Sequence, residues 1–343
     1  MVADNRPGTG PRVTVLIPCY NLGAYLNDAV ESVLAQTYQD FEILIVDDGS
    51  TDPDTVRLLD DYVRPKTTVY RTPNRKVAAA RNFLIQRARG EYLCPLDADD
   101  RLHPEYLEKT VAALQHDRSL GFVSTRLQTF GTETRVWPDD TRCDLVTLLC
   151  GDPVHCAALV RRSAVLAVGG YDDNMPHQGN RDWDLSISLV EAGHHGIILD
   201  DVLFFYRRRP GSMSEESTRG AVHIDLIEYL VRKHAASYRE HWHDVVRFKD
   251  REREELETLN ATLEQELPPL ASSVERRREE LTMLKRRLDE ARQGNAAGAA
   301  AEAAHRSAVS EVMALRSSAS WRITAPLRAL YDVFLGVRKG GGA

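Results

Sequence analysis

The stretch that decides the fold is residues 90–100, Gly-Glu-Tyr-Leu-Cys-Pro-Leu-Asp-Ala-Asp-Asp. Its apolar part, 92–96, predicts a short strand buried on both faces, and a cluster of carboxylates follows directly. Two further apolar, β-branched runs precede it, at 13–17 and 41–46, and the second also ends in acids, Asp47-Asp48. Acidic residues at the ends of buried strands indicate a ligand site at that edge of a sheet.

Helical periodicity fills the gaps between these strands. Apolar residues recur at helical spacing over 25–34, 56–63 and 78–88, and Gly90 stands where a C-terminal cap would. Strands alternating with helices of this length predict an α/β fold, with a mostly parallel sheet flanked by helices. No G-x-G-x-x-G follows the first strand and the chain has no G-x-x-x-x-G-K-[ST], so a dinucleotide-binding Rossmann site and a P-loop are both unsupported.

The composition narrows the class of protein. The 343 residues carry a net charge of −7, which argues against a nucleic-acid binder because neutralising phosphates needs clustered cations. Five cysteines without a C-x-x-C pair are typical of buried thiols in a reducing compartment. No apolar run reaches the ~18–20 residues of a membrane-spanning helix. We therefore expect a cytoplasmic protein, with peripheral contact at the inner face of the cell membrane left open.

The composition changes to long helices past residue 214. Mainly apolar heptad positions over 256–291 are typical of a coiled coil and predict self-association; the alternative is a solvated, charged helix pair. The basic end carries an apolar stripe that suits either an anionic bilayer surface or a partner protein. The predicted organisation is a disordered N-terminus (1–11), an α/β domain (12–220), a helical neck (221–248), coiled-coil-like helices broken at Pro268-Pro269 (249–292), an Ala/Gly-rich linker (293–310) and a basic amphipathic C-terminal segment (311–343).

The D-x-D pattern of Asp97 and Asp99 suggests metal chemistry. Two carboxylates this close can converge in the turn after a strand, and hard oxygen ligands suit Mg²⁺ or Mn²⁺, which commonly bridge to substrate phosphates. A second acidic strand end lies at Asp47-Asp48, and two such ends would repel a phosphate unless a cation intervened. A metal–diphosphate site is therefore favoured over a bare anion site.

Several blocks resemble family 2 glycosyltransferases of the GT-A fold, which is Rossmann-like. The resemblance covers about residues 12–215 and precedes an α-helical C-terminal extension. It implies a nucleotide-sugar donor, a divalent cation and inversion at the anomeric carbon. The matching blocks, in the expected order, are Val-Leu-Ile-Pro-Cys-Tyr-Asn (15–21), Ser-Val-Leu-Ala-Gln-Thr-Tyr (32–38), Ile-Val-Asp-Asp-Gly-Ser-Thr-Asp (45–52), Ala-Arg-Asn (80–82), residues 90–100, Gly-Gly-Tyr-Asp (169–172) and Arg-Asp-Trp-Asp-Leu (181–185).

The resemblance also implies roles for particular residues. Asp182 corresponds to the base that deprotonates the acceptor hydroxyl; the alternative for it is an N-cap of the helix that it opens. Asp99 should bind the metal on the diphosphate. The residues expected to contact the nucleotide are Pro18, Tyr20 and Asp48 around the nucleoside, with Asp48 accepting from the base, Asp97 near the ribose, and Arg81.

The chain also departs from the family pattern. Lys76 stands where glycine is common, so it either contacts the donor phosphates or marks an altered loop, and Arg181 precedes the base where an acidic residue is typical. The block 207–209 is three arginines beginning at Arg207, which resembles loops that close over the diphosphate; the alternative is a basic surface loop. His155 is a candidate acceptor contact or a structural residue. Without a Q-x-x-R-W block, a processive synthase is not expected.

These features predict an inverting transferase that moves one sugar to a hydroxyl of a glycan or lipid-linked acceptor. Residues 317–328 resemble an element at the ends of bacterial surface-polysaccharide enzymes, so we expect a role in cell-surface polysaccharide or glycolipid assembly. One alternative is a sugar nucleotidyltransferase, although 17–21 lacks its Gly-rich loop. The other is an inactive scaffold, which the retained acids argue against. UDP-, TDP- and GDP-linked donors are not distinguished.

Overall fold

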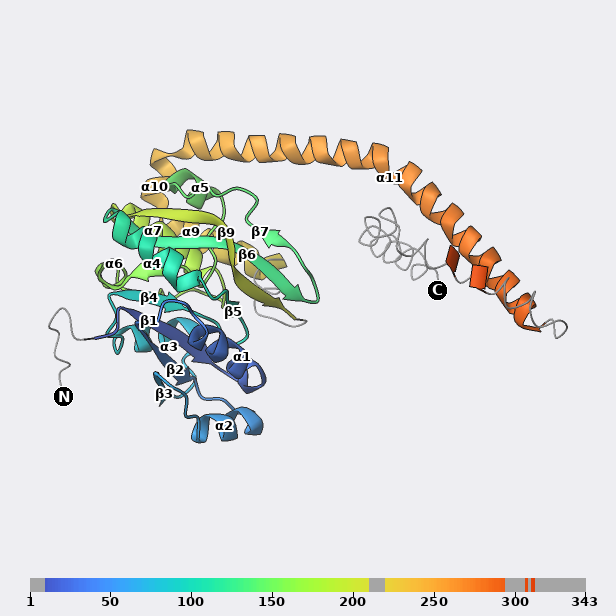
Figure 1. Cartoon of the computed structure of the whole chain (residues 1–343). Helices are drawn as coiled ribbons and strands as arrows, with labels where there is room; N and C mark the ends of the chain where they lie inside the picture. Colours follow the sequence, from blue (N-terminus) through green and yellow to red (C-terminus); the bar gives the residue numbers. More distant parts are fainter. Residues whose placement is uncertain (1–9, 210–219, 294–305, 308–309, 312–343) are drawn as a thin grey trace. The chain divides into compact units, whose positions relative to one another are not determined.

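The computed structural model describes residues 10–209, 220–293, 306–307 and 310–311 (Figure 1). Its strands are β1 (Val13–Cys19), β2 (Phe41–Asp47), β3 (Thr67–Arg71), β4 (Tyr92–Pro95), β5 (Arg101–Leu102), β6 (Leu120–Gly131), β7 (Val136–Trp137), β8 (Leu159–Arg161) and β9 (His195–Arg208). Its helices are α1 (Gly23–Leu34), α2 (Pro53–Asp60), α3 (Lys76–Ile85), α4 (Tyr106–His116), α5 (Leu145–Cys150), α6 (Arg162–Ala167), α7 (Arg181–Glu191), α9 (Gly220–Lys233), α10 (Ala235–Glu240) and α11 (Trp242–Gln293).

The strands form one sheet in the order β3-β2-β1-β4-β8-β6-β9-β5, with β7 paired to β6. The first four strands are parallel, as the alternation of strands and helices predicts. The later strands are mixed: β8 runs antiparallel to β4 and β6, β9 is parallel to β6, and β5 is antiparallel to β9. The α/β fold class is therefore confirmed, with a sheet whose second half is mixed.

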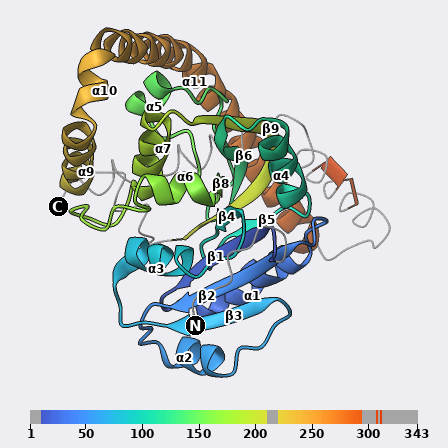
Figure 2. The same ribbon diagram turned by 90° about the vertical axis from the view of Figure 1, so that its left-hand side faces the viewer.

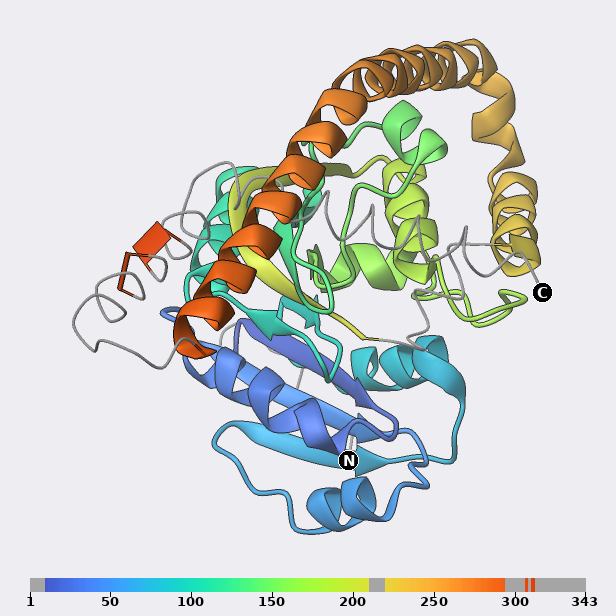
Figure 3. The same cartoon turned by 90° about the vertical axis from the view of Figure 1, so that its right-hand side faces the viewer.

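Two hydrophobic cores cover the two faces of this sheet. Successive residues of β1 point to opposite faces, so Ile17 packs with α1 and α4 while Leu16 packs with α3 and α7. Figures 2 and 3 show the two helix layers from opposite sides. Both faces of the first strands are covered, which explains why their sequences read as continuous apolar runs rather than alternating ones.

The carboxyl ends of β1, β2 and β4 meet at one edge. The Asp48 N–H donates to the carbonyl of Cys19 over 2.9 Å, and the Leu96 N–H donates to that of Leu16 over 2.9 Å. The two acidic strand ends therefore share this edge, although β1 lies between them. The edge is where parallel α/β sheets place their ligands.

Gly90 does not cap a helix. Helix α3 ends at Ile85, and Gly90 instead lies against β1, where its N–H donates to Thr14 Oγ1 over 2.9 Å. A Cβ added at Gly90 would lie 2.5 Å from the Thr14 nitrogen. The glycine is required for this close approach of two backbones, which the expectation of a helix cap misses.

The predicted helical neck is part of the first compact unit. The chain divides into Met1–Asp250 and Arg251–Ala343, so α9 and α10 belong with the sheet. The reason is apolar: Leu226 and Leu230 of α9 are fully buried in the core that also contains α7.

The predicted break at Pro268-Pro269 is wrong. Helix α11 is continuous, with both prolines inside it, and it bends part-way along its length (Figure 1). Proline removes a backbone donor and clashes one turn back, and a helix can absorb that as a bend instead of ending. The self-association expected from the heptad stays a prediction. The basic C-terminal segment (311–343) and most of residues 1–11 and 293–310 lie outside the described residues. Among the described helices, none has the length and apolar character needed to cross a membrane.

Candidate active site

Arg81 of α3 joins two carboxylates at the edge of the sheet where β1, β2 and β4 end. Its Nη1 donates to Asp182 Oδ1 over 2.7 Å, and its Nη2 donates to Asp97 Oδ1 over 2.7 Å. Its side chain is only 3% exposed. Burial alone would lower the pKa of Arg81, but Asp182 and Asp97 outweigh burial and raise it well above its ordinary value. A permanently charged guanidinium therefore links the end of β4 to the start of α7.

Asp182 is the second residue of α7, and its carboxylate faces Arg81 rather than the helix end. The helix is preceded by Asn180, so the alternative prediction that Asp182 is the N-cap is wrong. The Asp182 side chain is 25% exposed, so part of it remains accessible. Burial raises the pKa of Asp182, while Arg81 opposes that shift. A carboxylate with its proton affinity raised in this way suits a general base.

Asp184, two residues later, faces the opposite way because residues two apart on a helix do not share a face. It accepts from Lys233 Nζ over 2.8 Å and pairs with His234 Nε2 over 3.0 Å. The other ring nitrogen of His234 pairs with Glu191 over 2.8 Å. Burial alone would lower the pKa of His234, but these carboxylates outweigh it and raise the pKa above its ordinary value. Hydrogen bonds from His234, the residue between α9 and α10, therefore connect these helices to the helix that carries Asp182.

The turn after β4 is held by arginines of β9 and the residue after it. Arg209 Nε donates to Asp99 Oδ2 over 2.9 Å, and the Arg207 backbone N–H donates to Asp100 Oδ1 over 2.8 Å. Arg207 also donates through Nε to the carbonyl of Asp99 and through Nη2 to Asp28. The arginine block thus stabilises the acidic turn. Its predicted closure over a diphosphate would involve residues from 210, which lie outside the described ranges.

The residues at this turn fit a divalent cation in part. The oxygens of Asp97 and Asp100 and the sulfur of Cys156 lie within 4.8 Å of one another. Asp100 Oδ2 is buried without a hydrogen-bond partner, as expected of an oxygen that a cation would satisfy. Burial raises the pKa of the Cys156 thiol well above its ordinary value, and a neutral sulfur suits Mg²⁺ or Mn²⁺ poorly. The carboxylates fit the cation that the fold family implies, whereas the thiol does not.

The predicted ligand Asp99 is engaged by Arg209 and lies outside that cluster of three. Asp100, which sequence reasoning treated only as part of the block, is the residue that replaces it there. The burial of Asp100 could not be predicted from the sequence, because an extra acid in an acidic turn usually faces solvent.

The predicted nucleoside contacts lie at the ends of β1 and β2. Asp48 is buried, and its Oδ1 accepts from Thr72 Oγ1 over 3.1 Å and from the Arg75 N–H over 2.9 Å. Burial raises the pKa of Asp48, and those hydrogen bonds oppose the shift. Pro18 pairs with β2 in the sheet, whereas Tyr20, just beyond the strand, is 44% exposed and offers a free ring.

Lys76 occupies a position whose backbone favours glycine. Its φ is +70°, in the left-handed region that residues with a Cβ seldom adopt. It is also the first residue of α3 and its side chain is exposed. The backbone accounts for glycine being common there in the family. A contact between Lys76 and the donor phosphates stays a prediction.

His155 lies in the core. It is 5% exposed, and its ring packs against those of Phe204 and Tyr106. Its Nδ1 accepts from the Ala157 N–H over 3.2 Å, and burial lowers the pKa of the imidazole to about 3. A neutral, enclosed ring supports the structural alternative over a contact with a bound acceptor.

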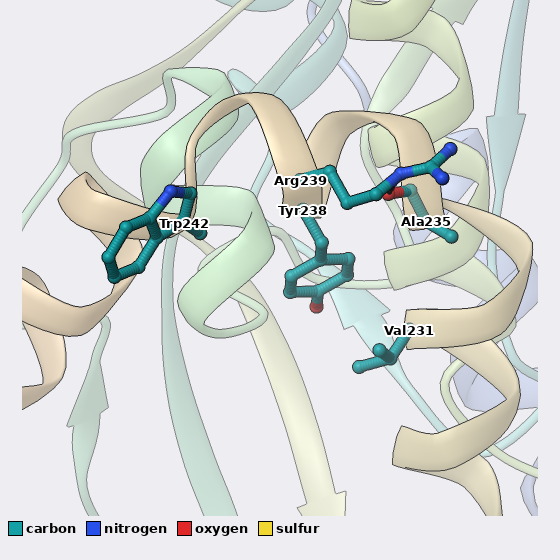
Figure 4. A pocket seen from close by; sticks show the side chains of 5 residues that line it. All are labelled: Val231, Ala235, Tyr238, Arg239 and Trp242. Atoms are coloured by element: carbon teal, nitrogen blue, oxygen red, sulfur yellow. Dashed lines mark hydrogen bonds between the residues drawn. The ribbon is translucent and has the colours of Figure 1, made fainter.

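A separate cavity of about 480 Å³ lies on the helices that follow the sheet (Figure 4). None of the predicted site residues lines it. Its lining residues are Val231, Ala235, Tyr238, Arg239 and Trp242.

The fold and the edge geometry together define a class. A partly parallel sheet with an acidic D-x-D turn, joined through Arg81 to a partly exposed aspartate at a helix start, agrees with the GT-A arrangement that the sequence resembles. Comparison with known proteins agrees: residues 14–169 match the family described as "Glycosyl transferase family 2". Residues 14–169, a little under half of the chain, are therefore similar to the family 2 glycosyltransferases.

Two of the relatives in sequence are bacterial proteins. The chain is 29% identical over 231 residues to EpsE of Bacillus subtilis, itself a provisionally assigned glycosyltransferase, covering 64% of this chain and 82% of EpsE. It is 31% identical over 192 residues to the chondroitin synthase of Escherichia coli, covering 53% of this chain but only 27% of that one.

Solved structures share the fold. The S. aureus protein TarS, residues 1–349, in complex with UDP-GlcNAc superposes with a TM-score of 0.51 at 17% identity. The match covers 67% of this chain and 75% of that one. It confirms the GT-A fold expected from the sequence.

Proposed function

We propose that this protein is a metal-dependent inverting glycosyltransferase that moves a single sugar from a nucleotide-diphosphate sugar to an acceptor hydroxyl. The observation that carries the proposal is the Arg81 bridge. It holds Asp97, on the donor side, and Asp182, the candidate base, on one guanidinium. The two halves of a transfer reaction are thereby fixed relative to each other before substrate binds.

In the proposed reaction Asp182 accepts the proton of the acceptor hydroxyl. The hydroxyl oxygen attacks the anomeric carbon while the bond from that carbon to the diphosphate oxygen breaks on the opposite face, so the configuration inverts and a nucleoside diphosphate leaves. The carboxylates of the turn 97–100 would hold Mn²⁺ or Mg²⁺, which neutralises charge on the leaving diphosphate. Asp48, Pro18 and Tyr20 would hold the nucleoside.

The relatives guide the choice of substrates. TarS has been crystallised with UDP and with UDP-GlcNAc, and two of the matched relatives are named for chondroitin synthesis and teichuronic acid biosynthesis. A UDP-sugar donor is therefore the first to test, ahead of TDP- and GDP-sugars. A glycan or lipid-linked acceptor in bacterial cell-surface polysaccharide assembly is the corresponding acceptor class.

The test is a screen of sugar transfer and donor hydrolysis with UDP-, TDP- and GDP-sugars, with Mn²⁺, with Mg²⁺ and with chelator. Asp182→Asn should reduce transfer by about 10²–10⁴-fold while leaving donor binding intact, and chelation should also abolish it. The matched control is Asp173→Asn, the same change at an exposed carboxylate nearby, which should retain activity.

Two results would contradict the proposal. Release of pyrophosphate from a nucleoside triphosphate and a sugar phosphate would establish a nucleotidyltransferase instead. Failure to bind any nucleoside diphosphate with Mn²⁺ in calorimetry would establish the inactive scaffold.

We also propose that the helical tail self-associates through the heptad over 256–291. Among its residues, Leu256 and Leu259 are exposed, which suits a face awaiting a partner helix. Sedimentation should show a larger assembly for the full chain than for a chain ending at Asp250, the boundary of the first unit. Two monomers would refute this. Flotation with anionic vesicles would separate membrane contact by 311–343 from contact with a partner protein.

A further inference from the structure

Arg181 is a buried cation without a direct ion-pair partner in the described chain. It is 3% exposed, and both its Nε and its Nη1 are buried without a hydrogen-bond partner. Within the described ranges no carboxylate lies at ion-pair distance from it. The other arginines of the same edge differ, because Arg81, Arg207 and Arg209 each pair with at least one aspartate.

Such an arrangement is unfavourable in the free protein. A buried charge is ordinarily paired and fully hydrogen-bonded, since desolvation is not otherwise offset. Burial lowers the pKa of Arg181, and the neighbouring Arg81 lowers it further by repulsion. The charges of Asp182, Asp172 and Asp173 oppose that shift, but none of these carboxylates is at ion-pair distance from Arg181 in the described chain, and Asp182 is already hydrogen-bonded to Arg81. Arg181 therefore keeps two buried N–H donors that no atom of the described chain satisfies.

The residues just before Arg181 share its unsatisfied character. The side-chain nitrogens Gln178 Nε2 and Asn180 Nδ2 are also buried without acceptors. Asn180 has a φ of +52°, a left-handed conformation that asparagine tolerates better than most residues. Every unsatisfied atom over 178–181 is thus a donor. A ligand that supplies several oxygens and negative charge completes this set, whereas a cation or an apolar group does not.

The position of this segment says which substrate brings the oxygens. Arg181 directly precedes Asp182, the group that would take the proton of the acceptor hydroxyl. The donor diphosphate belongs at the turn 97–100, where the arginines already pair with aspartates. Arg181 is close enough to Asp182 and Arg81 for their charges to shift its pKa, so an anion bound by the segment 178–181 would lie near the candidate base.

We propose that Arg181, with the side-chain amides of Gln178 and Asn180, binds an oxyanion carried by the acceptor, either the carboxylate of a sugar acid or the phosphate of a phosphorylated sugar. This inference rests on the proposed function, because it takes Asp182 as the base. It assigns the substitution of arginine for the family's usual acidic residue to acceptor recognition.

The test compares Arg181→Met with the wild type and with Arg162→Met. Arg162 is a matched control because it begins α6, and its Nε is likewise buried without a partner. Thermal unfolding is followed with glucuronate, with glucose 6-phosphate and with neutral glucose. One of the two anions, and not glucose, should raise the melting temperature of the wild type and of Arg162→Met but not that of Arg181→Met. The anion that does so identifies the carboxylate or the phosphate.

The fold should survive the substitution, because replacing a buried, unpaired charge by an apolar side chain does not lower stability. Transfer by Arg181→Met to an acceptor carrying the anion should show a KM about 10- to 100-fold higher, with the KM for a neutral acceptor unchanged. Asn180→Gly keeps the left-handed backbone and removes the amide, so it should give a smaller rise in the same KM.

Two outcomes overturn the inference: neither anion stabilises the wild type, or each stabilises Arg181→Met equally well. Donor hydrolysis by the wild type reports on the proposed function separately. An enzyme that hydrolyses its donor but binds no acceptor anion refutes this inference alone, whereas one that binds no nucleotide refutes the proposed function.

Discussion

The turn 97–100 and the segment 178–181 lie at the same edge of the sheet but differ in whether their charged groups are paired. At the turn 97–100 each acidic group meets a donor of the protein, with Asp97 on Arg81, Asp99 on Arg209 and Asp100 on the Arg207 backbone. In the segment 178–181 the donors outnumber the acceptors, and Arg181 has no partner in the described chain. In the turn 97–100 every carboxylate has a protein donor, although Asp100 Oδ2 is left without one, whereas Arg181 has no partner among the described residues to lose.

This difference teaches how substitutions should be interpreted. Removing a partner from the turn 97–100 leaves a buried charge uncompensated, so it should affect folding as well as activity. Removing a donor from the segment 178–181 leaves no buried charge without its partner, so it should affect substrate binding alone. The following changes test that contrast, beginning with the largest expected effect.

Arg81→Met should be the most damaging change, because it leaves both Asp97 and Asp182 without their shared cation. We expect the free energy of unfolding to fall by about 3–5 kcal/mol, measured by urea denaturation. Arg181→Met, measured in parallel, should show no comparable loss. Equal losses in the two variants would break the comparison.

His234→Gln should lower the free energy of unfolding by about 2 kcal/mol at pH 6, because it removes the charged hydrogen bonds to Asp184 and Glu191. The folded-state pKa of His234 is raised, so its contribution is fully present below the ordinary value near 6.5 and is lost as pH rises through the raised value. Urea titrations at pH 6 and pH 9 should show the gap to wild type narrowing. A gap independent of pH would mean that His234 acts by packing alone.

Lys76→Gly should have the smallest effect and the opposite sign. Glycine adopts a φ of +70° without strain, so the melting temperature should rise by a few degrees, equivalent to about 1 kcal/mol. The KM of Lys76→Gly for the donor should also be measured, since an increase would show that Lys76 contacts the diphosphate. Lys76→Ala, which removes the charge but keeps a Cβ, is the control and should gain no stability.

The parallel half of the sheet could be predicted because its strands are buried on both faces. A strand of this kind has an unbroken apolar sequence, as at 13–17 and 41–46. The second half could not, since β6 and β9 are long strands with irregular register that pair across many residues of sequence. The helix break expected at Pro268-Pro269 was also a local prediction. Proline is unfavourable inside a helix, but α11 continues through both prolines and accommodates them by bending.

The site divides in the same manner. Asp97, Asp182 and Arg81 were all found through the resemblance, but the bridge that Arg81 makes between the two aspartates was not, because Arg81 and Asp182 are 101 residues apart. Asp100 and His234 left no signal, since an acid in an acidic turn and a histidine in a helix are ordinary on a surface. Lys76 had a signal: a lysine where glycine is common indicates a left-handed backbone, which the structure shows.

The contacts of Asp184 on α7 with Lys233 and His234 at the end of α9 set the minimum length of a stable fragment. The family match ends at residue 169, before Asp182, so a fragment trimmed to that match would lack the proposed base. A fragment ending after α7 would contain it but would leave Asp184 buried without Lys233 and His234. We therefore expect the shortest fragment that folds and acts on its own to extend past His234. Truncated versions of this chain should end after α10.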